Sequence, residues 1–412
     1  MPRVLVTDSS ERAALAVIRS LGKRGIEIIA ADSVGLNAGF FSKYCSQRFI
    51  YPSPLQYKSK FVKSILYFVK RSNVDLLIPI TDFTMIPILE NNDEFEGYVK
   101  VAAPPFETAI KALDKFQTVR IAEKCGVPFP KSFIPFHAEN IEEIATIVRY
   151  PVVIKPRMKV FWNGEQAVLF KVTSRNYAYN EQDLMRKYDR IISEFGKFGV
   201  PCNFFMIQEF AKGSSYGVEL LMNKSELKAV FMHKRIREYP ITGGASTLRM
   251  SIWDRRLMDY AVNLLREMGW QGVAMVEFKL NEQDRSVKLI EVNGRFWGSL
   301  SLAINAGVDF PYFLYKILSE TCHFNPPTYF VGIKQRWLIP GDLLWFYSSV
   351  ITRREFLRPV KDFLDSFIVK DDIISLDDPV PTLGILKTSL GYIMDVLRGT
   401  RSIAGEFLRS RE

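Results

Sequence analysis

The first hundred residues alternate between short apolar runs and helical patterns, and this alternation restricts the fold more than any other feature of the chain. The apolar runs lie at residues 3–8, 26–32, 74–80 and 99–104, and the helical patterns lie between them. Strands that alternate with helices form a parallel sheet with helices packed on its faces. The pattern therefore predicts a Rossmann-like α/β domain over residues 1–105.

The first strand-to-helix turn of this domain has the sequence TDSSER (7–12). It lacks the GxGxxG pattern with which a dinucleotide pyrophosphate is bound. A nicotinamide-dependent oxidoreductase is therefore disfavoured, and a structural α/β domain is the better interpretation of this region.

Size and composition exclude several other classes of protein. The chain has 412 residues, of which 48% are hydrophobic and 24% charged, which suits two or three globular domains. No run of eighteen apolar residues predicts a membrane-spanning helix, and the N-terminus lacks the apolar segment of a signal peptide. The net charge of +10 is scattered along the chain, and none of the common nucleic-acid-binding signatures is present.

The cysteines give no sign of a disulfide framework or a zinc site, because they are widely spaced and form no CxxC pair. They are Cys45, Cys125, Cys202 and Cys322. A reducing compartment, the cytoplasm, is the expected location.

Residues 273–295 predict a hairpin with acidic residues on one face. Pairing the two strands across their polar turn places Glu277 opposite Glu291, and alternation places Asn293 on the same face. The other face is expected to be core, with Val276, Phe278, Leu280, Ile290 and Val292.

Two neighbouring carboxylates repel one another unless a cation lies between them. Carboxylate and amide oxygens are hard ligands that suit Mg²⁺, which commonly binds through one or two carboxylates together with phosphate oxygens. A solvated hairpin face is the competing interpretation. The Gly294-Arg295 pair directly after Asn293 favours a site, in which Arg295 would bind an anion.

Two lysines and one strand end add signs of a phosphate ligand. Lys155 ends the buried strand 150–157, where a charge is costly unless it meets an anion, and Lys115 begins a nearby helix. A lysine that simply reaches solvent remains an alternative for both. The apolar strand 203–213 runs into Gln208 and Glu209 and then a short Phe-Ala hinge, which offers backbone groups to an adenine edge or is merely a strand exit.

Taken together, the order of these segments resembles the ATP-grasp superfamily of carboxylate–amine and carboxylate–thiol ligases, over roughly residues 1–320. Within it, the chain is most similar to the synthetase domains of the carbamoyl phosphate synthetase large subunit. The segments that carry the resemblance are LDKFQTVRIAEKCGVPFP, YPVVIKP, IQEFAKG, MVEFKL and LIEVNGR.

The resemblance implies an α/β (α+β) architecture with three parts. A pre-ATP-grasp domain would span residues 1–105 and an ATP-grasp domain residues 106–320. The latter would divide into a lid at about 130–210 and a metal-binding subdomain at about 211–320. Residues 321–412 are expected to form a mainly helical extension.

The resemblance also implies a role for each matching residue, with ATP and Mg²⁺ (or Mn²⁺) as cofactors. ATP would be bound by Lys115, Lys155, Gln208, Glu209, Phe210, Ala211 and, in place of the usual ribose-binding acid, Glu219. The metal ligands would be Glu277, Glu291 and Asn293, and the catalytic residues Arg295 and Arg235.

Two segments depart from the family pattern or add to it. The lid segment after Lys155 has one glycine, Gly164, where many relatives have a glycine-rich phosphate loop. In 233–247, Arg235 and Arg237 alternate and are expected to share a face, and the following Gly-Gly-Ala-Ser-Thr loop offers donors to an anion. A surface turn with ordinary charges is the alternative for this stretch.

The implied activity is the ATP-dependent activation of a small carboxylate as an acylphosphate and its coupling to an amine, in a cytoplasmic enzyme that forms homodimers or acts alone. Bicarbonate activation, as in carbamoyl phosphate synthetase, is one alternative. A non-catalytic nucleotide-binding or membrane-associated protein, with the aromatic and basic region 321–412 as its contact surface, is another. No nucleic-acid partner is expected.

Overall fold

The computed structural model describes residues 2–241, 243–319, 327–353, 357–364, 369–385 and 394. Cys322 and most of the segment beyond residue 385 lie outside the described residues. Within the described part, Cys45, Cys125 and Cys202 are free thiols, and no helix is long and apolar enough to cross a membrane.

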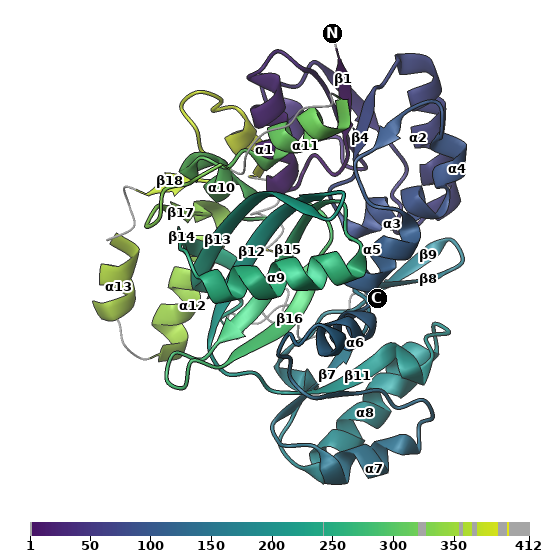
Figure 1. The fold of residues 1–412 in the computed structure, drawn as a ribbon, viewed down its shortest axis with the longest axis vertical. Coiled ribbons are helices and arrows are strands. Elements are labelled where there is room, and N and C mark those ends of the chain that lie inside the picture. The colour runs from purple at the N-terminus through teal and green to yellow at the C-terminus, as the bar shows by residue number, and fades with distance from the viewer. Residues whose placement is uncertain are drawn as a thin grey trace.

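The N-terminal part is a parallel five-stranded sheet, as the alternating pattern predicts (Figure 1). Its spatial order is β3-β2-β1-β4-β5. The strands are β1 (Arg3–Val6), β2 (Glu27–Asp32), β3 (Gln47–Ile50), β4 (Leu76–Ile78) and β5 (Lys100–Val101). The helices are α1 (Arg12–Gly22), α2 (Lys58–Ser72), α3 (Asp82–Glu90) and α4 (Asn92–Phe95), followed by α5 (Phe106–Leu113) and α6 (Lys115–Lys124). The edge strand β3 escapes prediction because it is short, begins with two polar residues and is largely exposed.

The second sheet lies within the segment predicted to be the lid and has the order β10-β7-β11-β6. Its strands are β6 (Ser132–Phe133), β7 (Val152–Pro156), β10 (Tyr177–Ala178) and β11 (Phe205–Glu209), and its helices are α7 (Asn140–Ile147) and α8 (Glu181–Gly196). A separate hairpin, β8 (Val160–Asn163) and β9 (Gln166–Leu169), leaves this sheet directly after β7. We call β8 and β9 the lid hairpin.

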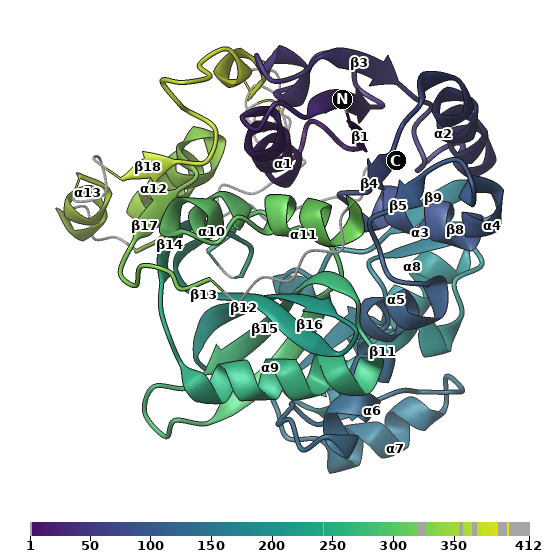
Figure 2. The same ribbon diagram turned by 45° about the horizontal axis from the view of Figure 1, so that its top comes forward.

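The largest sheet has seven strands in the order β16-β15-β12-β13-β14-β17-β18. The strands are β12 (Ser214–Asn223), β13 (Glu226–Tyr239), β14 (Ala245–Ser251), β15 (Gly272–Leu280), β16 (Val287–Asn293), β17 (Lys334–Arg336) and β18 (Lys370–Asp371). Helix α9 (Arg255–Met268) covers one face. On the other face, α10 (Leu300–Ala306) and α11 (Phe310–Ser319) lie between this sheet and α1 (Figure 2).

One hydrophobic core joins the first sheet to the largest one. Val4 and Val17 of the N-terminal domain belong to the same buried cluster as Leu302, Phe310 and Met275. The N-terminal domain is therefore packed firmly against the face of the sheet that carries the acidic residues of the hairpin.

The C-terminal region adds β17, β18, α12 (Leu343–Arg353) and α13 (Leu357–Leu364) to this body. We call residues 370–378 the C-terminal strap. Its Asp372 accepts hydrogen bonds from Arg12 (2.7 Å), Arg249 and Ser301 (2.5 Å), which come from α1, β14 and α10. Three elements from two domains therefore meet at one buried carboxylate.

A second group of contacts continues along the strap. Asp378 accepts from Arg19 (2.9 Å) and Ser42 (2.7 Å), and Asp377 pairs with Lys43 (2.8 Å). The strap thus holds the N-terminal domain against the seven-stranded sheet.

Candidate functional site

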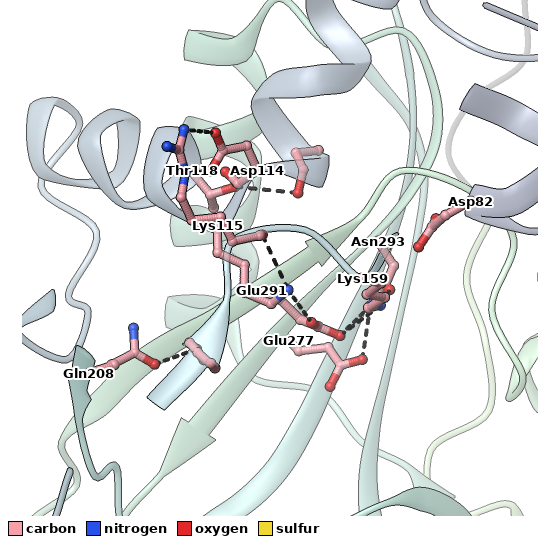
Figure 3. A network of polar contacts seen from close by, with 12 residues as sticks. Asp82, Asp114, Lys115, Thr118, Lys159, Gln208, Glu277, Glu291 and Asn293 are labelled. Atoms are coloured by element: carbon pink, nitrogen blue, oxygen red, sulfur yellow. Dashed lines mark hydrogen bonds and ion pairs between the residues drawn. The ribbon is translucent and has the colours of Figure 1, made fainter. Parts of the chain in front are cut away.

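Strands β15 and β16 place the acidic residues together. They pair antiparallel with Glu277 opposite Glu291, the register that the sequence predicts. The Asn293 amide nitrogen donates to Glu277 Oε1 at 2.9 Å and to Glu291 Oε1 at 3.3 Å (Figure 3). The amide oxygen of Asn293 therefore points away from the two carboxylates, and it accepts from Lys159.

The hairpin differs from the predicted alternation at one position. A bulge after Glu277 pairs Phe278 with Leu289, so that Ile290 is the extra residue of the longer strand. The prediction that Ile290 belongs to the core is therefore wrong. Leu289 is buried in its place, together with Phe278 and Val292.

Lys159 supplies a cation to this cluster. Its Nζ lies 2.7 Å from Asn293 Oδ1 and 3.2 Å from Glu291 Oε1. Local sequence pattern does not identify Lys159 as a site residue, because one lysine in a polar loop has no periodic or motif signature. The one available sign was that Lys159 follows Lys155 by four residues, in the loop where a glycine-rich segment was missing.

The two predicted lysines lie on the opposite side of Glu291. Lys115 Nζ is 3.9 Å from Glu291 Oε2, and Lys155 Nζ donates to the side-chain oxygen of Gln208. Burial lowers the pKa of Lys155 to about 7, with a further decrease from Lys115 that Glu291 partly opposes. Burial also lowers the pKa of Lys115, against the attraction of Glu291.

Glu291 is the electrostatic centre of the site. Burial opposes its ionisation, but the positive charges of Lys159, Lys115 and Lys155 outweigh burial and hold its pKa well below the usual range. Glu291 is therefore ionised at every ordinary pH.

The predicted adenine hinge has a well-defined backbone. The Glu209 N–H donates to the Lys131 carbonyl, and the Phe210 N–H donates to the Pro151 carbonyl. The Phe210 side chain is 46% exposed and meets the Tyr177 ring edge-on. Gln208 is buried and points to Lys155, so its side chain positions a lysine beside the hinge.

The two predicted catalytic arginines both face the hairpin cluster. Arg295 Nε pairs with Asp82 of α3 at 2.9 Å, and its Nη2 lies 3.4 Å from Asn293 Oδ1. Arg235 pairs with Glu277 at 2.5 Å. Attraction to Asp82 raises the pKa of Arg295 although burial opposes it.

The expectation that Arg237 shares a face with Arg235 is wrong. Irregular pairing between β13 and β14 on both sides of Arg237 changes the alternation. Arg237 instead pairs with Asp342 at 2.9 Å and stacks over Trp345, in the C-terminal region. The prediction assumed a regular strand with alternating side chains, and the two bulges interrupt that alternation.

The loop at 243–247 also differs from the expected donor-rich cradle. Thr247 donates to Asp342 at 3.0 Å and Ser246 donates to the Leu248 carbonyl at 3.2 Å. Both hydroxyls are buried and engaged within the protein, so nothing in their placement marks an anion site.

Glu219 lies in the middle of β12, fully buried, with its Oε1 2.6 Å from His233 Nδ1 and 3.5 Å from Ser299 Oγ. The buried carboxylate of Glu219 is engaged by His233 and Ser299, so its placement gives no support to the predicted ribose contact.

A small pocket lies beside Glu291 and is lined by Asp82, Lys115 and Lys159 among others. It is bounded by α3, α5, the start of α6, the loop before β8, and β16. Its lining residues are Asp82, Ile86, Ala112, Leu113, Lys115, Met158, Lys159, Val160, Glu291 and Val292.

The balance of charge around the pocket suits a polyanion bound with a metal. The cationic side chains of Lys115, Lys155, Lys159, Arg235 and Arg295 outnumber the carboxylates of Asp82, Glu238, Glu277 and Glu291 that pair with them. Among the described residues, no group of three or more His, Cys, Asp or Glu side chains is placed to hold a metal. Two carboxylates and one amide oxygen nevertheless fit Mg²⁺, which takes its other ligands from phosphate and water. The Lys159 ammonium already marks a position where a cation is stabilised.

Comparison with known proteins agrees with this geometry. The family model described as "ATP-grasp in the biosynthetic pathway with Ter operon" matches residues 202–338, which include the hairpin cluster and its neighbouring strands. This segment of the chain is therefore similar to ATP-grasp proteins. Enzymes of this superfamily use ATP and Mg²⁺.

Among curated proteins, the carbamoyl phosphate synthase large chain of Methanobrevibacter smithii is 24% identical over 253 residues. The match covers 58% of this chain and 22% of the relative, so the chain corresponds to about a fifth of that enzyme.

Two solved structures show the same fold. One is the biotin carboxylase domain dimer of Hydrogenobacter thermophilus 2-oxoglutarate carboxylase, in complex with MgADP, ADP and bicarbonate (TM-score 0.61, 17% identity, 81% of this chain and 73% of that chain). The other is the L-amino acid ligase of Bacillus licheniformis (TM-score 0.57, 14% identity, 79% of this chain and 76% of that chain).

The lowered pKa of Lys155 predicts that ATP binding takes up a proton. A phosphate group next to Lys155 favours its charged form, so the pKa of about 7 rises on binding. Binding at pH 8 should then take up about one proton, and affinity should fall as the pH rises above 7. Calorimetric titration of ATP in two buffers of different ionisation enthalpy measures the uptake. Lys155→Arg is the control, because arginine stays charged and should abolish it. Equal uptake by both proteins would show that Lys155 does not meet the phosphates.

Proposed function

We propose that this protein is an ATP-dependent ligase that converts a small carboxylate to an acylphosphate and couples it to an amine, with release of ADP and phosphate. The observation that carries this proposal is the cluster of Glu277, Glu291 and Asn293 beside the lysines Lys115, Lys155 and Lys159. Glu291, Lys115 and Lys159 line the pocket next to it. This arrangement combines metal ligands with phosphate-binding cations. The described site brings no nucleophilic side chain together with a general base, and this reaction requires none.

In the proposed reaction, a carboxylate oxygen attacks the γ-phosphorus of ATP and the bond to the ADP oxygen breaks. Lys115 and Lys155 bind phosphate oxygens, and Arg295, held by Asp82, orients the reacting carboxylate or phosphoryl group. A bound Mg²⁺ would supply further neutralisation of phosphate charge through Glu277, Glu291 and Asn293. Positioning and electrostatic stabilisation should provide most of the acceleration.

In the second half-reaction, an amine attacks the acyl carbon and phosphate leaves. Adenine would lie beside the hinge of Glu209, Phe210 and Ala211. The N–H groups of Glu209 and Phe210 are bonded to protein carbonyls, so its edge would meet other backbone groups of the hinge. Glu219 is the weakest of these assignments, since it is buried against His233.

Bicarbonate is a second candidate for the activated acid. The similarity to carbamoyl phosphate synthase favours it, because the first half-reaction would then form carboxyphosphate in the same pocket. We further propose a cytoplasmic enzyme, and a homodimer is the assembly to test first, since one similar structure is a dimer.

The direct test measures ADP release with MgATP and pooled acceptors: amino acids, dipeptides and bicarbonate, each with and without pooled amines. The expected result is ADP release that depends on one carboxylate pool, with a hydroxamate formed when hydroxylamine replaces the amine. ATP that binds but is not hydrolysed with any pool would count against a ligase and favour a nucleotide-binding role.

A further inference from the structure

Lys159 occupies an unusual position for a lid residue. It lies in the loop between β7 and β8, and its ammonium contacts Asn293 Oδ1 at 2.7 Å and Glu291 Oε1 at 3.2 Å. Both oxygens belong to the proposed metal ligands. An ammonium and a divalent cation cannot both bind the same lone pairs, and two cations a few ångströms apart repel strongly in a partly buried site.

The loop that carries Lys159 is held at both ends. On one side, Arg157 pairs with Asp114, the residue that caps α6, and the Lys115 N–H donates to the Arg157 carbonyl at 3.0 Å. The residues on either side of the pocket are thereby tied together.

On the other side, the lid hairpin reaches across to the N-terminal domain (Figure 1). The Trp162 indole donates to the Pro54 carbonyl at 3.3 Å, and the Ser59 N–H at the start of α2 donates to Glu165 at 2.9 Å. The contact of Lys159 with the metal ligands thus belongs to a closed arrangement of the lid.

Among the three lysines around Glu291, Lys159 is the best suited to move. Its side chain is 35% exposed, compared with 11% for Lys115, and Lys155 is buried in its strand. Lys159 can leave Glu291 without unpacking the core. A polyanion entering the pocket would offer it a stronger partner than one shared carboxylate.

We propose that Lys159 is an internal counter-ion that keeps divalent metal out of the site until nucleotide phosphates draw its ammonium away. The inference rests on the proposed function and deepens it. Metal then binds weakly to the free protein and enters together with the nucleotide. Lys159 also takes the place of the phosphate cradle that a glycine-rich loop would provide, because this loop has few glycines.

Mn²⁺ titration of the nucleotide-free, full-length protein tests the proposal, with free Mn²⁺ measured by electron paramagnetic resonance. Lys159→Met should bind Mn²⁺ roughly tenfold more tightly than wild type, within the usual range of coupling between two sites. Lys159→Arg, which keeps the charge, should behave like wild type. Lys197→Met removes an exposed lysine at the end of α8 and should also have no effect.

The same variant should change metal-free ATP binding in the opposite direction. Lys159→Met should weaken ATP binding several-fold in the presence of EDTA, because a phosphate partner is lost. If Lys159 had a purely structural role, its replacement would not strengthen Mn²⁺ binding while weakening ATP binding. Lys159→Gln repeats the test if the methionine variant does not fold.

Two results would overturn parts of this account separately. Equal Mn²⁺ affinity of wild type and Lys159→Met, with binding abolished by Glu291→Gln in both, would reject the counter-ion and leave the metal site in place. Mn²⁺ binding that is insensitive to Glu291→Gln, with or without ATP, would reject the proposed metal site and the counter-ion together.

Discussion

Replacing Glu291 with glutamine should reduce ADP formation by at least about 100-fold, the scale of losing one preorganised electrostatic group from an active site. The side chain keeps its size but loses the charge that Lys159, Lys115 and Lys155 surround. The three lysines would then repel one another without a counter-charge, and the metal would lose a carboxylate ligand. A coupled assay for ADP, at saturating ATP and with the stimulating acceptor, measures the loss.

Glu282→Gln is the matched control, since Glu282 lies at the turn of the same hairpin, 54% exposed, and pairs with Lys234. It should keep nearly full activity. Full activity of Glu291→Gln as well would contradict the ligand assignment, whereas loss in both variants would point to a general disturbance of the hairpin.

Replacing Asp372 with alanine should lower the free energy of unfolding by about 3–5 kcal/mol, the cost of breaking a buried ion pair from one side. Its side chain is 1% exposed, and its loss leaves the guanidinium groups of Arg12 and Arg249 without their shared carboxylate. The midpoint of urea unfolding and the melting temperature should both fall.

Asp377→Ala is the control on the same strap. Its carboxylate is 42% exposed, so the ion pairs with Lys23 and Lys43 should contribute less than about 1 kcal/mol. Equal effects of the two variants would show that Asp372 does not join the domains as the structure suggests.

The contribution of Asp372 to the free energy of unfolding also depends on pH. Burial opposes ionisation, but Arg249 and Arg12 outweigh it and lower the pKa in the folded protein. The stabilisation is therefore complete above the unfolded pKa of about 4 and is lost as the pH falls through the lower folded value.

The sequence was sufficient to predict the hairpin register, because a two-residue alternation and a polar turn determine which residues face each other. Glu277, Glu291 and Asn293 could be brought together on that basis alone, and a helix–strand alternation was sufficient for the N-terminal sheet. Bulges limit this reasoning. One extra residue moved Leu289 into the core in place of Ile290, and irregular pairing separated Arg237 from Arg235.

Contacts between distant segments could not be predicted from local pattern. Lys159 reaches Asn293 across 134 residues, and Arg12 reaches Asp372 across 360 residues. Each depends on how whole domains pack, and a single lysine or aspartate carries no periodic signal of such a contact.

The most direct test of the central claim is the transfer of ¹⁸O from a labelled carboxylate substrate to phosphate during turnover with MgATP. If the carboxylate attacks the γ-phosphorus of ATP in this site, each turnover should place one carboxylate oxygen in the released phosphate, as mass spectrometry would detect. Turnover that leaves all label in the carboxylate or the product, with unlabelled phosphate, would contradict acylphosphate formation and the ligase mechanism built on it.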